Sequence, residues 1–489
     1  MKRRAPLSLL LAALLAVAPA SSQSLPDLGD ASSASLSDSQ ERTIGNRIMR
    51  EVRVDPLYID DPEVTEYINS LGARLLSGVD GPRRDIDFFV VQDETINAFA
   101  LVGGHIGVHT GLFTLTQNES ELAGVLAHEI AHITQRHQAR AIHGQRGASF
   151  TSLAALAIAI LASRGNSNQS GQVTEAAIAG AAAYSMQNMI DYTREHEREA
   201  DRVGLTILER TGFSPRAMAT FFERLLRANR LNELKGAPSY LRTHPLTTER
   251  IADIQDRVES MPSRLIADTG EYRLVKAKLR ATTGPAIEAI SYFRAQIAER
   301  TVLRPKEENY GLAVALRRTR EFDAAWKALE PLRDTKPSEP QFELLAAQLL
   351  TDQGRLDEAL KVYRAGLRAF PQSRGIIYGY LNLQLQAGHP AEVIADLDER
   401  LRNIQDDPKL YELQARAFAA TGKQLAQHRA QAEAHFRRGN LGGAVEQLEQ
   451  AVKIKTDDFY EASSAESRLR ELRAQLDIER AAEKALKIS

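Results

Sequence analysis

The segment LAGVLAHEIAHITQRH, residues 122–137, carries two histidines four positions apart, His128 and His132, with Glu129 directly after the first. Positions four apart on a helix lie on the same face, so both imidazoles could reach one tetrahedral zinc ion at about 2.0–2.1 Å. Glu129 is rotated by about 100° from His128, where it could take a proton from a water held by the metal. The spacing indicates metal-assisted hydrolysis; an ordinary amphipathic helix is the alternative.

A hydrolytic zinc site of this kind needs a third protein ligand, because such sites combine three ligands with one water. The segment REHEREAD, residues 194–201, offers four acids in a short stretch. Glu197 and Asp201 are four apart and share a helix face, which suits one ligand and one acceptor that orients a ligand imidazole. Arginines interleave with these acids, so a solvated, ion-paired face is the alternative. The spacing leaves both possibilities open.

Three further histidines lie near this motif. His137 is nine residues after His128 and falls off the ligand-bearing face. His105 and His109 belong to GGHIGVHTG, residues 103–111, whose alternating pattern predicts a glycine-bracketed strand at a sheet edge. These two histidines would be about 13 Å apart along a strand, too far to bind one ion together. We expect them to be exposed strand residues.

The histidine motif requires a stable helix to position it, and the sequence supplies one. Leu122, Val125 and Leu126 fall on or near one apolar stripe, and Asn118 or Ser120 precedes it as a capping residue. A second apolar segment, residues 150–162, is too short to span a bilayer. It predicts a buried helical hairpin or, alternatively, a hairpin that touches a membrane surface.

The N-terminal segment is typical of an export signal. A basic start is followed by an apolar run over residues 7–17 and by small residues at 18–20. A short membrane anchor or a buried first helix is the alternative. The chain has no cysteine, which excludes cysteine-ligated metals, thiol nucleophiles and lipidation at a cysteine after the signal. The net charge of −2 gives no indication of nucleic-acid binding. These features together favour a periplasmic location.

The C-terminal third repeats with a period of 34 residues. Gly354, Gly388 and Gly422 follow one another at this spacing, and so do Ala325 and Ala359. A helix–turn–helix unit of this length is the signature of tetratricopeptide repeats, and glycine suits the tight turn after the first helix of each pair. We expect roughly four units with a divergent end; an unrelated helical bundle is the alternative.

These segments define a mainly α-helical chain. We expect a signal peptide at 1–22 and a zincin-type α+β metalloprotease domain with a small sheet at 36–265. A helical linker at 266–304 and an α-solenoid of tetratricopeptide repeats at 305–480 would follow.

Four motifs in order, NAFALVGGHIGVHTGLF, ELAGVLAHEIAH, EREAD and RTHPLTTERI, resemble the gluzincin metallopeptidase family of the CAAX prenyl protease and the bacterial heat-shock membrane protease. The resemblance covers about residues 40–260. It implies one zinc ion with Glu197 as the third ligand and Asp201 as the acid that orients a ligand histidine. It also implies that residues 103–111 hold an extended substrate by strand addition.

His244, in the motif THP, matches a histidine that recurs in this family. It could donate to the tetrahedral oxyanion, or it could occupy the fourth zinc position and keep the enzyme latent. A plain loop histidine is the remaining alternative. We favour gating, because an unregulated protease beside unfolded proteins would be harmful.

The whole chain resembles the periplasmic, repeat-carrying members of the family. The resemblance implies unfolded or misassembled proteins as substrates and the outer-membrane β-barrel assembly machinery as a partner of the repeats. Two other functions stay open. The chain could act mainly as a chaperone-like adaptor with a rarely active site, or residues 150–162 could place it in peripheral contact with a membrane.

Overall fold

A computed structural model describes residues 37–81, 84–138, 140, 194–231, 239–261, 266–299, 305–334 and 338–488. The expected signal peptide and the apolar segment 150–162 lie outside the described residues. Helices dominate, and three strands form one small sheet, so the expected fold class is confirmed. Within the described ranges, none of the helices has the length and apolar character needed to cross a membrane.

The sheet contains β1 (Asp87–Val91), β2 (Ala98–Leu101) and β3 (His105–His109), in the order β1-β3-β2. β1 pairs with β3 in parallel and β2 pairs with β3 antiparallel. The expectation that 103–111 forms an edge strand is therefore wrong, because β3 is central and β2 lies at the edge. Every residue of β3 is buried. Side chains on both faces of β3 are buried, so the alternating sequence pattern does not mark an exposed face.

The two strand histidines are consequently buried and not exposed as expected. His105 is 4% and His109 is 2% exposed. His109 Nδ1 lies 2.9 Å from Thr95 Oγ1, and His105 Nδ1 lies 3.4 Å from the carboxylate of Asp87. Neither histidine belongs to the cluster of candidate metal ligands formed by the described residues. His109 joins β3 to the loop before β2, and His105 joins β3 to β1.

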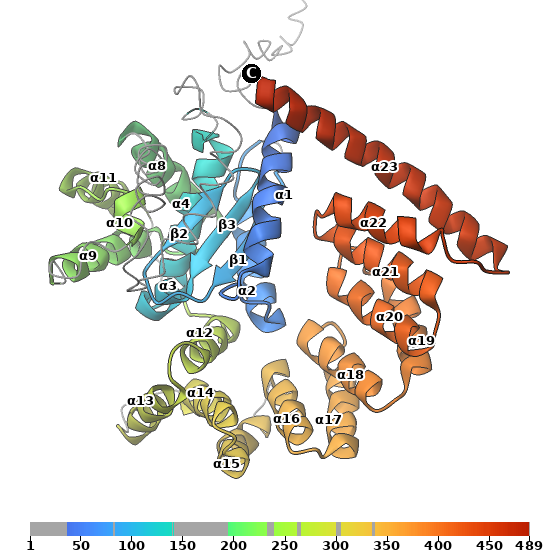
Figure 1. Ribbon diagram of the computed structural model, residues 1–489. Helices are drawn as coiled ribbons and strands as arrows, with labels where there is room; N and C mark the ends of the chain where they lie inside the picture. The colour runs from blue at the N-terminus through green and yellow to red at the C-terminus, as the bar shows by residue number, and fades with distance from the viewer. Residues whose placement is uncertain are drawn as a thin grey trace, which may run out of the picture.

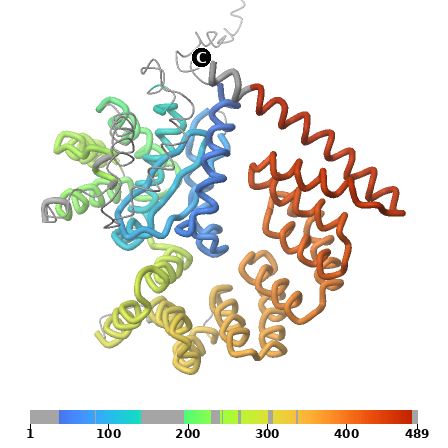
Figure 2. The backbone as a smooth tube through the Cα atoms, viewed as in Figure 1, coloured from blue at the N-terminus to red at the C-terminus, as the bar shows by residue number. Residues whose placement is uncertain are grey.

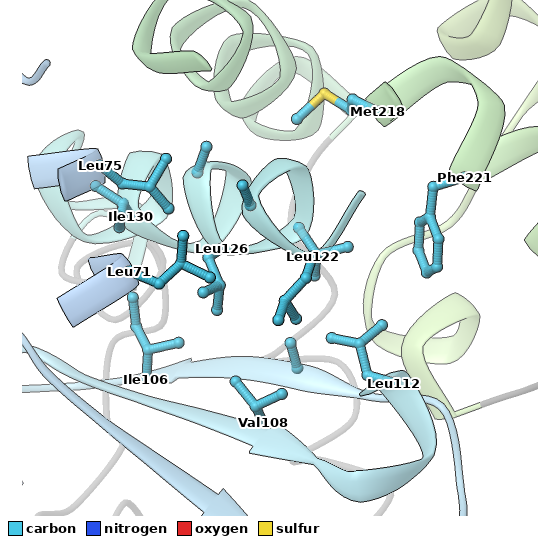
Figure 3. Packing of buried hydrophobic residues seen from close by; sticks show 14 of the residues in the cluster. Leu71, Leu75, Ile106, Val108, Leu112, Leu122, Leu126, Ile130, Met218 and Phe221 are labelled. Carbon is cyan, nitrogen blue, oxygen red and sulfur yellow. The ribbon is translucent and has the colours of Figure 1, made fainter. Parts of the chain in front are cut away.

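The helix that carries His128, Glu129 and His132 (the HExxH motif) is α4 (Glu119–Thr134), and it runs through the centre of the N-terminal core, the apolar cluster that it shares with the sheet. Asn118 caps it by accepting from the backbone N–H of Glu121, as one of the two expected caps. Leu122, Leu126 and Ile130 pack toward Ile106 and Val108 of the sheet (Figure 3). All residues from Glu119 to Ile133 are buried, so the helix is enclosed on every side instead of presenting one polar face.

Among the described residues, the helices that pack around this core include α2 (Pro62–Leu76), α3 (Thr110–Leu115), α8 (Arg194–Thr211) and α9 (Pro215–Leu231). Gly204 brings α8 close to α4: a Cβ atom at this position would lie 3.2 Å from the backbone nitrogen of His128. A larger residue would push the two helices apart. The close approach allows the acids of α8 to reach the histidines of α4.

Two shorter elements complete the site. They are α10 (Ser239–Thr243), which is followed directly by His244, and α11 (Thr248–Glu259). The backbone N–H of Tyr240 donates to Ile96 O at 3.1 Å, and the N–H of His244 donates to Tyr240 O at 2.8 Å. These bonds tie the segment with His244 to the loop that precedes β2.

The repeat region forms a curved array of helices. Its members are α14 (Pro305–Arg318), α15 (Phe322–Arg333), α16 (Pro340–Asp352), α17 (Leu356–Ala369), α18 (Arg374–Gln386), α19 (Pro390–Leu401), α20 (Pro408–Ala420), α21 (Gln424–Arg437), α22 (Leu441–Ala451) and α23 (Phe459–Ile488). Gly354, Gly388 and Gly422 all have positive φ, between 72° and 82°, at the turn inside a helix pair. Arg320, one period before Gly354, has φ 63° and makes the same turn. The four pairs from α14 to α21 agree with the expected count.

The array curves around the N-terminal core, so that α23, its last helix, lies beside α1 (Asp38–Val54) (Figures 1 and 2). α12 (Gly270–Thr282) joins the two parts: Tyr272 and Leu279 belong to the N-terminal core, while Leu274 and Ala281 belong to the core of the array. α13 (Ala286–Ala298) follows it. At the far end, Arg50 of α1 (Asp38–Val54) donates to the carbonyl oxygen of Gly439 at 2.8 Å. The N-terminal domain therefore contacts both ends of the array.

Candidate metal centre

Four buried side chains from three separate segments converge at the centre of the N-terminal core. One ligand atom from each of His128, His132, Glu197 and His244 lies within 4.8 Å of the others. His128 Nε2 and His132 Nε2 are 3.0 Å apart, and each lies 3.4 Å from a carboxylate oxygen of Glu197. The structure thus brings the residues predicted as ligands into one cluster, although the acids of α8 are far from α4 in the sequence.

His244 lies at the fourth corner of the same cluster. Its Nδ1 is 3.1 Å from Glu197 Oε1 and 3.4 Å from His128 Nε2. The ring of Tyr240 stacks on the ring of His244, with centroids 4.7 Å apart and an angle of 25°. The other nitrogen of His244, Nε2, lies 3.5 Å from Glu129 Oε1. His244 is therefore held between the carboxylates of Glu197 and Glu129.

Asp201 and Arg250 form a second layer behind these ligands. Asp201 Oδ1 lies 3.0 Å from His128 Nδ1, the nitrogen that faces away from the cluster. Arg250, on α11, donates to Asp201 from Nε at 2.8 Å and from Nη2 at 2.9 Å. Its Nη1 lies 2.8 Å from Glu197 Oε2 and also donates to Pro245 O. One guanidinium thus fixes two acids and the loop that carries His244.

Sequence reasoning did not single out Arg250, although it stands in the quoted motif RTHPLTTERI. An arginine in a helix normally suggests a solvated face, because arginine is rarely buried without a charged partner. The available signal was its apolar neighbour Ile251, which is also buried, but a side chain that is 3% exposed could not be inferred from that alone. His137 was also missed as a contact of the cluster: its Nδ1 lies 2.8 Å from His132 Nδ1.

Comparison with known proteins agrees with this arrangement. A family model described as peptidase family M48 matches residues 62–258, and a tetratricopeptide-repeat model matches residues 350–417. The β-barrel assembly-enhancing protease of Escherichia coli (strain K12) is 34% identical over 452 residues, which cover 91% of each chain. The chain belongs to peptidase family M48. The resemblance drawn from four motifs is therefore confirmed.

Other M48 relatives show how far the likeness extends. The β-barrel assembly-enhancing protease of Yersinia pestis is 32% identical over 90% of this chain and 89% of its own length. The mitochondrial metalloendopeptidase OMA1 of Schizosaccharomyces pombe is 32% identical over 170 residues, 35% of this chain and 46% of that protein. The first likeness includes the repeat array, whereas the second spans about a third of this chain. As an M48 member, the chain is a metallopeptidase.

The charges in the M48 site fit a divalent cation. Burial lowers the pKa of His128, but the carboxylates of Asp201 and Glu197 outweigh it and raise this pKa to about 10. Burial acts to raise the pKa of Glu197, yet His244 and His128 hold it well below the usual range. Two buried acids therefore stabilise a positive charge among the imidazoles, which is the charge that a metal ion would supply.

The spacing of the donors also fits a tetrahedral ion. Bonds of about 2.0–2.1 Å place tetrahedral ligand atoms roughly 3.3 Å apart. The distances given above fall between 3.0 and 3.4 Å, with Glu197 Oε2 measured to His128 and Oε1 to His132 and His244, and one donor atom from each residue lies within 4.8 Å of the others. Two imidazole nitrogens, one carboxylate and a third imidazole form a borderline-soft donor set that zinc accepts well.

Glu129 lies beside this cluster without belonging to it. The side chain is fully buried, and burial raises the pKa of its carboxyl group. A raised pKa brings a carboxylate closer to the range in which it can both take and return a proton. Glu129 therefore has the environment that a general base requires.

Proposed function

We propose that the chain is a zinc-dependent endopeptidase of the periplasm that acts on unfolded or misassembled proteins during outer-membrane protein assembly. The observation that carries the proposal is the buried cluster of His128, His132 and Glu197, whose donor atoms lie 3.0 to 3.4 Å apart. Glu129 Oε1 lies 3.5 Å from the fourth member of the cluster, His244. The relatives named β-barrel assembly-enhancing proteases, which share the full arrangement of peptidase and repeats, support the biological setting.

In this proposal His128, His132 and Glu197 hold one zinc ion. The ion, when bound, supplies a Lewis acid that lowers the pKa of a water molecule and polarises the scissile carbonyl. Glu129 accepts the proton from the water and later gives it to the leaving amine. Asp201 orients His128 through its Nδ1, and Arg250 keeps the charge of Asp201 and Glu197 in place.

His244 has the role of a gate in this proposal. Its Nδ1 lies in the donor cluster, in the position that a catalytic site leaves open for water. His244 must therefore move aside before hydrolysis can begin. The Tyr240 stack and the bonds of α10 to Ile96 are the contacts that movement would break.

The repeat array is the proposed recruitment surface for clients and for the outer-membrane assembly machinery. A groove of about 950 Å³ opens at its C-terminal end and is lined by Tyr411, Phe418, Arg429 and Arg468 among others. Phe459 and Tyr460, at the start of α23, are 84% and 79% exposed beside this groove. Concave repeat surfaces with aromatic side chains suit extended peptide segments.

The substitution Glu129→Gln tests the peptidase proposal in the full-length chain. It removes the proton acceptor and leaves the four donors in place, so zinc content and melting temperature should match the parent while digestion of an unfolded protein ceases. Glu209→Gln, on the exposed face of α8, is the matched control and should keep full activity. Digestion by the Glu129→Gln variant at the parental rate would show that the base is assigned wrongly.

The position of His244 also favours a second function, that of an adaptor whose peptidase site is rarely open. In that case the binding of client proteins by the repeats would account for most of the function, and catalysis would be dispensable. Complementation of a deletion strain by the Glu129→Gln variant distinguishes the two. Full complementation favours the adaptor, and failure to complement, at equal protein level, favours the peptidase.

A further inference from the structure

The two imidazoles of the HExxH motif differ in what lies behind them. His128 presents its Nδ1 directly to a carboxylate, that of Asp201, at 3.0 Å. His132 presents its Nδ1 to another imidazole, His137 Nδ1, at 2.8 Å. Ligand histidines need a partner on the distal nitrogen to fix both the tautomer and the ring orientation. The second ligand is therefore supported by a different kind of partner from the first.

A single turn in the left-handed region brings His137 to this position. On a continuous helix, a residue five positions after His132 would lie about 140° around the axis and could not face it. The helix ends instead at Thr134, and Arg136 has φ 54°, which reverses the chain. The guanidinium of Arg136 pairs with Glu41 at 2.7 Å and holds the turn against α1. A non-glycine residue with positive φ costs free energy and needs such support.

The far side of His137 contacts a carboxylate. His137 Nε2 lies 3.0 Å from Glu199 Oε2, and Arg140 Nη1 lies 3.3 Å from the same oxygen. The ring of His137 is fully buried and stacks on His196 of α8, with centroids 4.5 Å apart and an angle of 17°. His137 thus lies between a candidate ligand on α4 and an acid on α8, two residues from Glu197.

These contacts leave one consistent arrangement of protons, given the proposed zinc site. A histidine that binds a metal through Nε2 must carry its proton on Nδ1. His132 Nδ1–H then donates to His137 Nδ1, so His137 must carry its own proton on Nε2. That Nε2–H donates in turn to the carboxylate of Glu199, which only accepts. Each group in the chain of three has a partner of the correct polarity.

We propose that His137 is a positioning residue for the peptidase reaction, which fixes His132 as a metal ligand and connects it to the charge of Glu199. The inference rests on the proposed zinc site and extends it. His137 is not one of the four residues of the donor cluster. It acts by holding the His132 ring in the tautomer and orientation that aim the Nε2 lone pair at the donor cluster.

Zinc affinity of the full-length protein, measured by competition with a chromophoric chelator, tests this role without reference to activity. His137→Phe keeps a flat ring to stack on His196 but removes both hydrogen bonds, so zinc binding should weaken by about 10–100-fold. His137→Asn places an amide oxygen near the position of Nδ1 and should recover most of the affinity. Glu199→Gln removes only the charge and should cause a smaller loss. His389→Phe, in the repeat array, is the control and should bind zinc as the parent does.

Cobalt substitution adds a readout that a packing defect alone would not change. With Co²⁺ in place of zinc, His137→Phe should shift the visible absorption bands, while the metal-free melting temperature stays near that of the parent. Zinc affinity and cobalt spectrum equal to the parent would overturn the inference, and so would an Asn variant as weak as the Phe variant. If His137→Phe does not fold, the His137→Asn and Glu199→Gln variants carry the test. A parent chain that binds no zinc would overturn the proposed function itself, whereas normal binding by parent and Phe variant alike would overturn only the role of His137.

Discussion

Arg250 donates two parallel hydrogen bonds of 2.8 and 2.9 Å to the carboxylate of Asp201, and both side chains are almost completely buried. A buried, bidentate pair of this kind is strongly coupled, because either charge alone would be left desolvated without a partner. The pair links the orienting acid of the site to α11, an element with no candidate metal ligand. A substitution of Arg250 should therefore also disturb the geometry of the metal centre.

We expect Arg250→Gln to lower the free energy of unfolding by about 3–5 kcal/mol, the usual loss when one partner of a buried ion pair is removed. The loss of zinc should accompany it, because Glu197 also loses its contact with Nη1. Urea unfolding in the presence of a chelator measures the first effect, and metal analysis measures the second. Arg257→Gln, which breaks an exposed pair with Asp253 on the same helix, should cost less than about 1 kcal/mol. Equal losses of unfolding free energy in the two variants would show that the buried pair stabilises the fold no more than the exposed pair does.

His244→Ala distinguishes the two roles that the sequence left open for this residue. If His244 gates the site, its removal opens the fourth position while three donors remain, so peptide cleavage should rise at unchanged zinc content. If it stabilises the oxyanion, cleavage should fall by about 10²–10³-fold. Initial rates on an unfolded protein, together with zinc per chain, separate these outcomes. A variant that cleaves at the parental rate with parental zinc would exclude both roles.

The contact between the protease domain and the middle of the array should depend on pH. Glu66 of α2 accepts from the backbone N–H of Arg374 at the start of α18, and burial raises its pKa to about 7. A carboxyl group whose folded pKa lies above its unfolded value of about 4.5 binds more protons when folded. Its contribution to stability is therefore present below pH 4.5 and is lost as the pH rises to 7.

We expect the substitution Glu66→Gln, which cannot ionise, to raise the melting temperature relative to the parent at pH 8 and to have less effect at pH 5. The amide oxygen can still accept from Arg374, so the contact itself should persist. Differential scanning calorimetry at both pH values provides the measurement. Glu259→Gln, at an exposed position of α11, controls for the change in net charge. A difference in melting temperature between the Glu66→Gln variant and the parent that is the same at both pH values would contradict the assigned pKa.

The sequence was most informative where chemistry is local. The spacing of His128 and His132, the Asn118 cap and the 34-residue glycine period all depend on neighbours along one helix or one turn, and the structure agrees with them. Glu197 required the family resemblance, because only the packing of α8 on α4 at Gly204 brings it to the histidines.

The predictions that failed depend on long-range pairing or on rare backbone conformations. The strand at 105–109 was predicted at an edge because its own residues do not indicate that β2 pairs with it. His137 was dismissed on helical geometry, since a left-handed Arg136 cannot be foreseen from an arginine. For the same reason Arg320 escaped the repeat series, although it makes the same turn as the three glycines. A turn with positive φ is predicted from the sequence when glycine occupies it, and it is missed when another residue does.

The last prediction concerns the polar contact that joins α1 to the end of the array. Arg50 and Arg53 donate to the carbonyl oxygens of Gly439 and Arg438, in the turn between α21 and α22. Hydrogen bonds from a charged donor contribute about 1.5–3 kcal/mol each, so the double variant Arg50→Ala, Arg53→Ala should release this end of the array and leave the metal centre intact. Hydrogen exchange should accelerate in α21 and α22 but not in α4. Arg42→Ala, also on α1, breaks an exposed pair with Asp85 in the segment before β1 and should leave exchange in α21 and α22 unchanged. Among the described residues, no apolar cluster spans this contact. Unchanged exchange in the double variant would therefore mean that Arg50 and Arg53 do not hold this end of the array against α1.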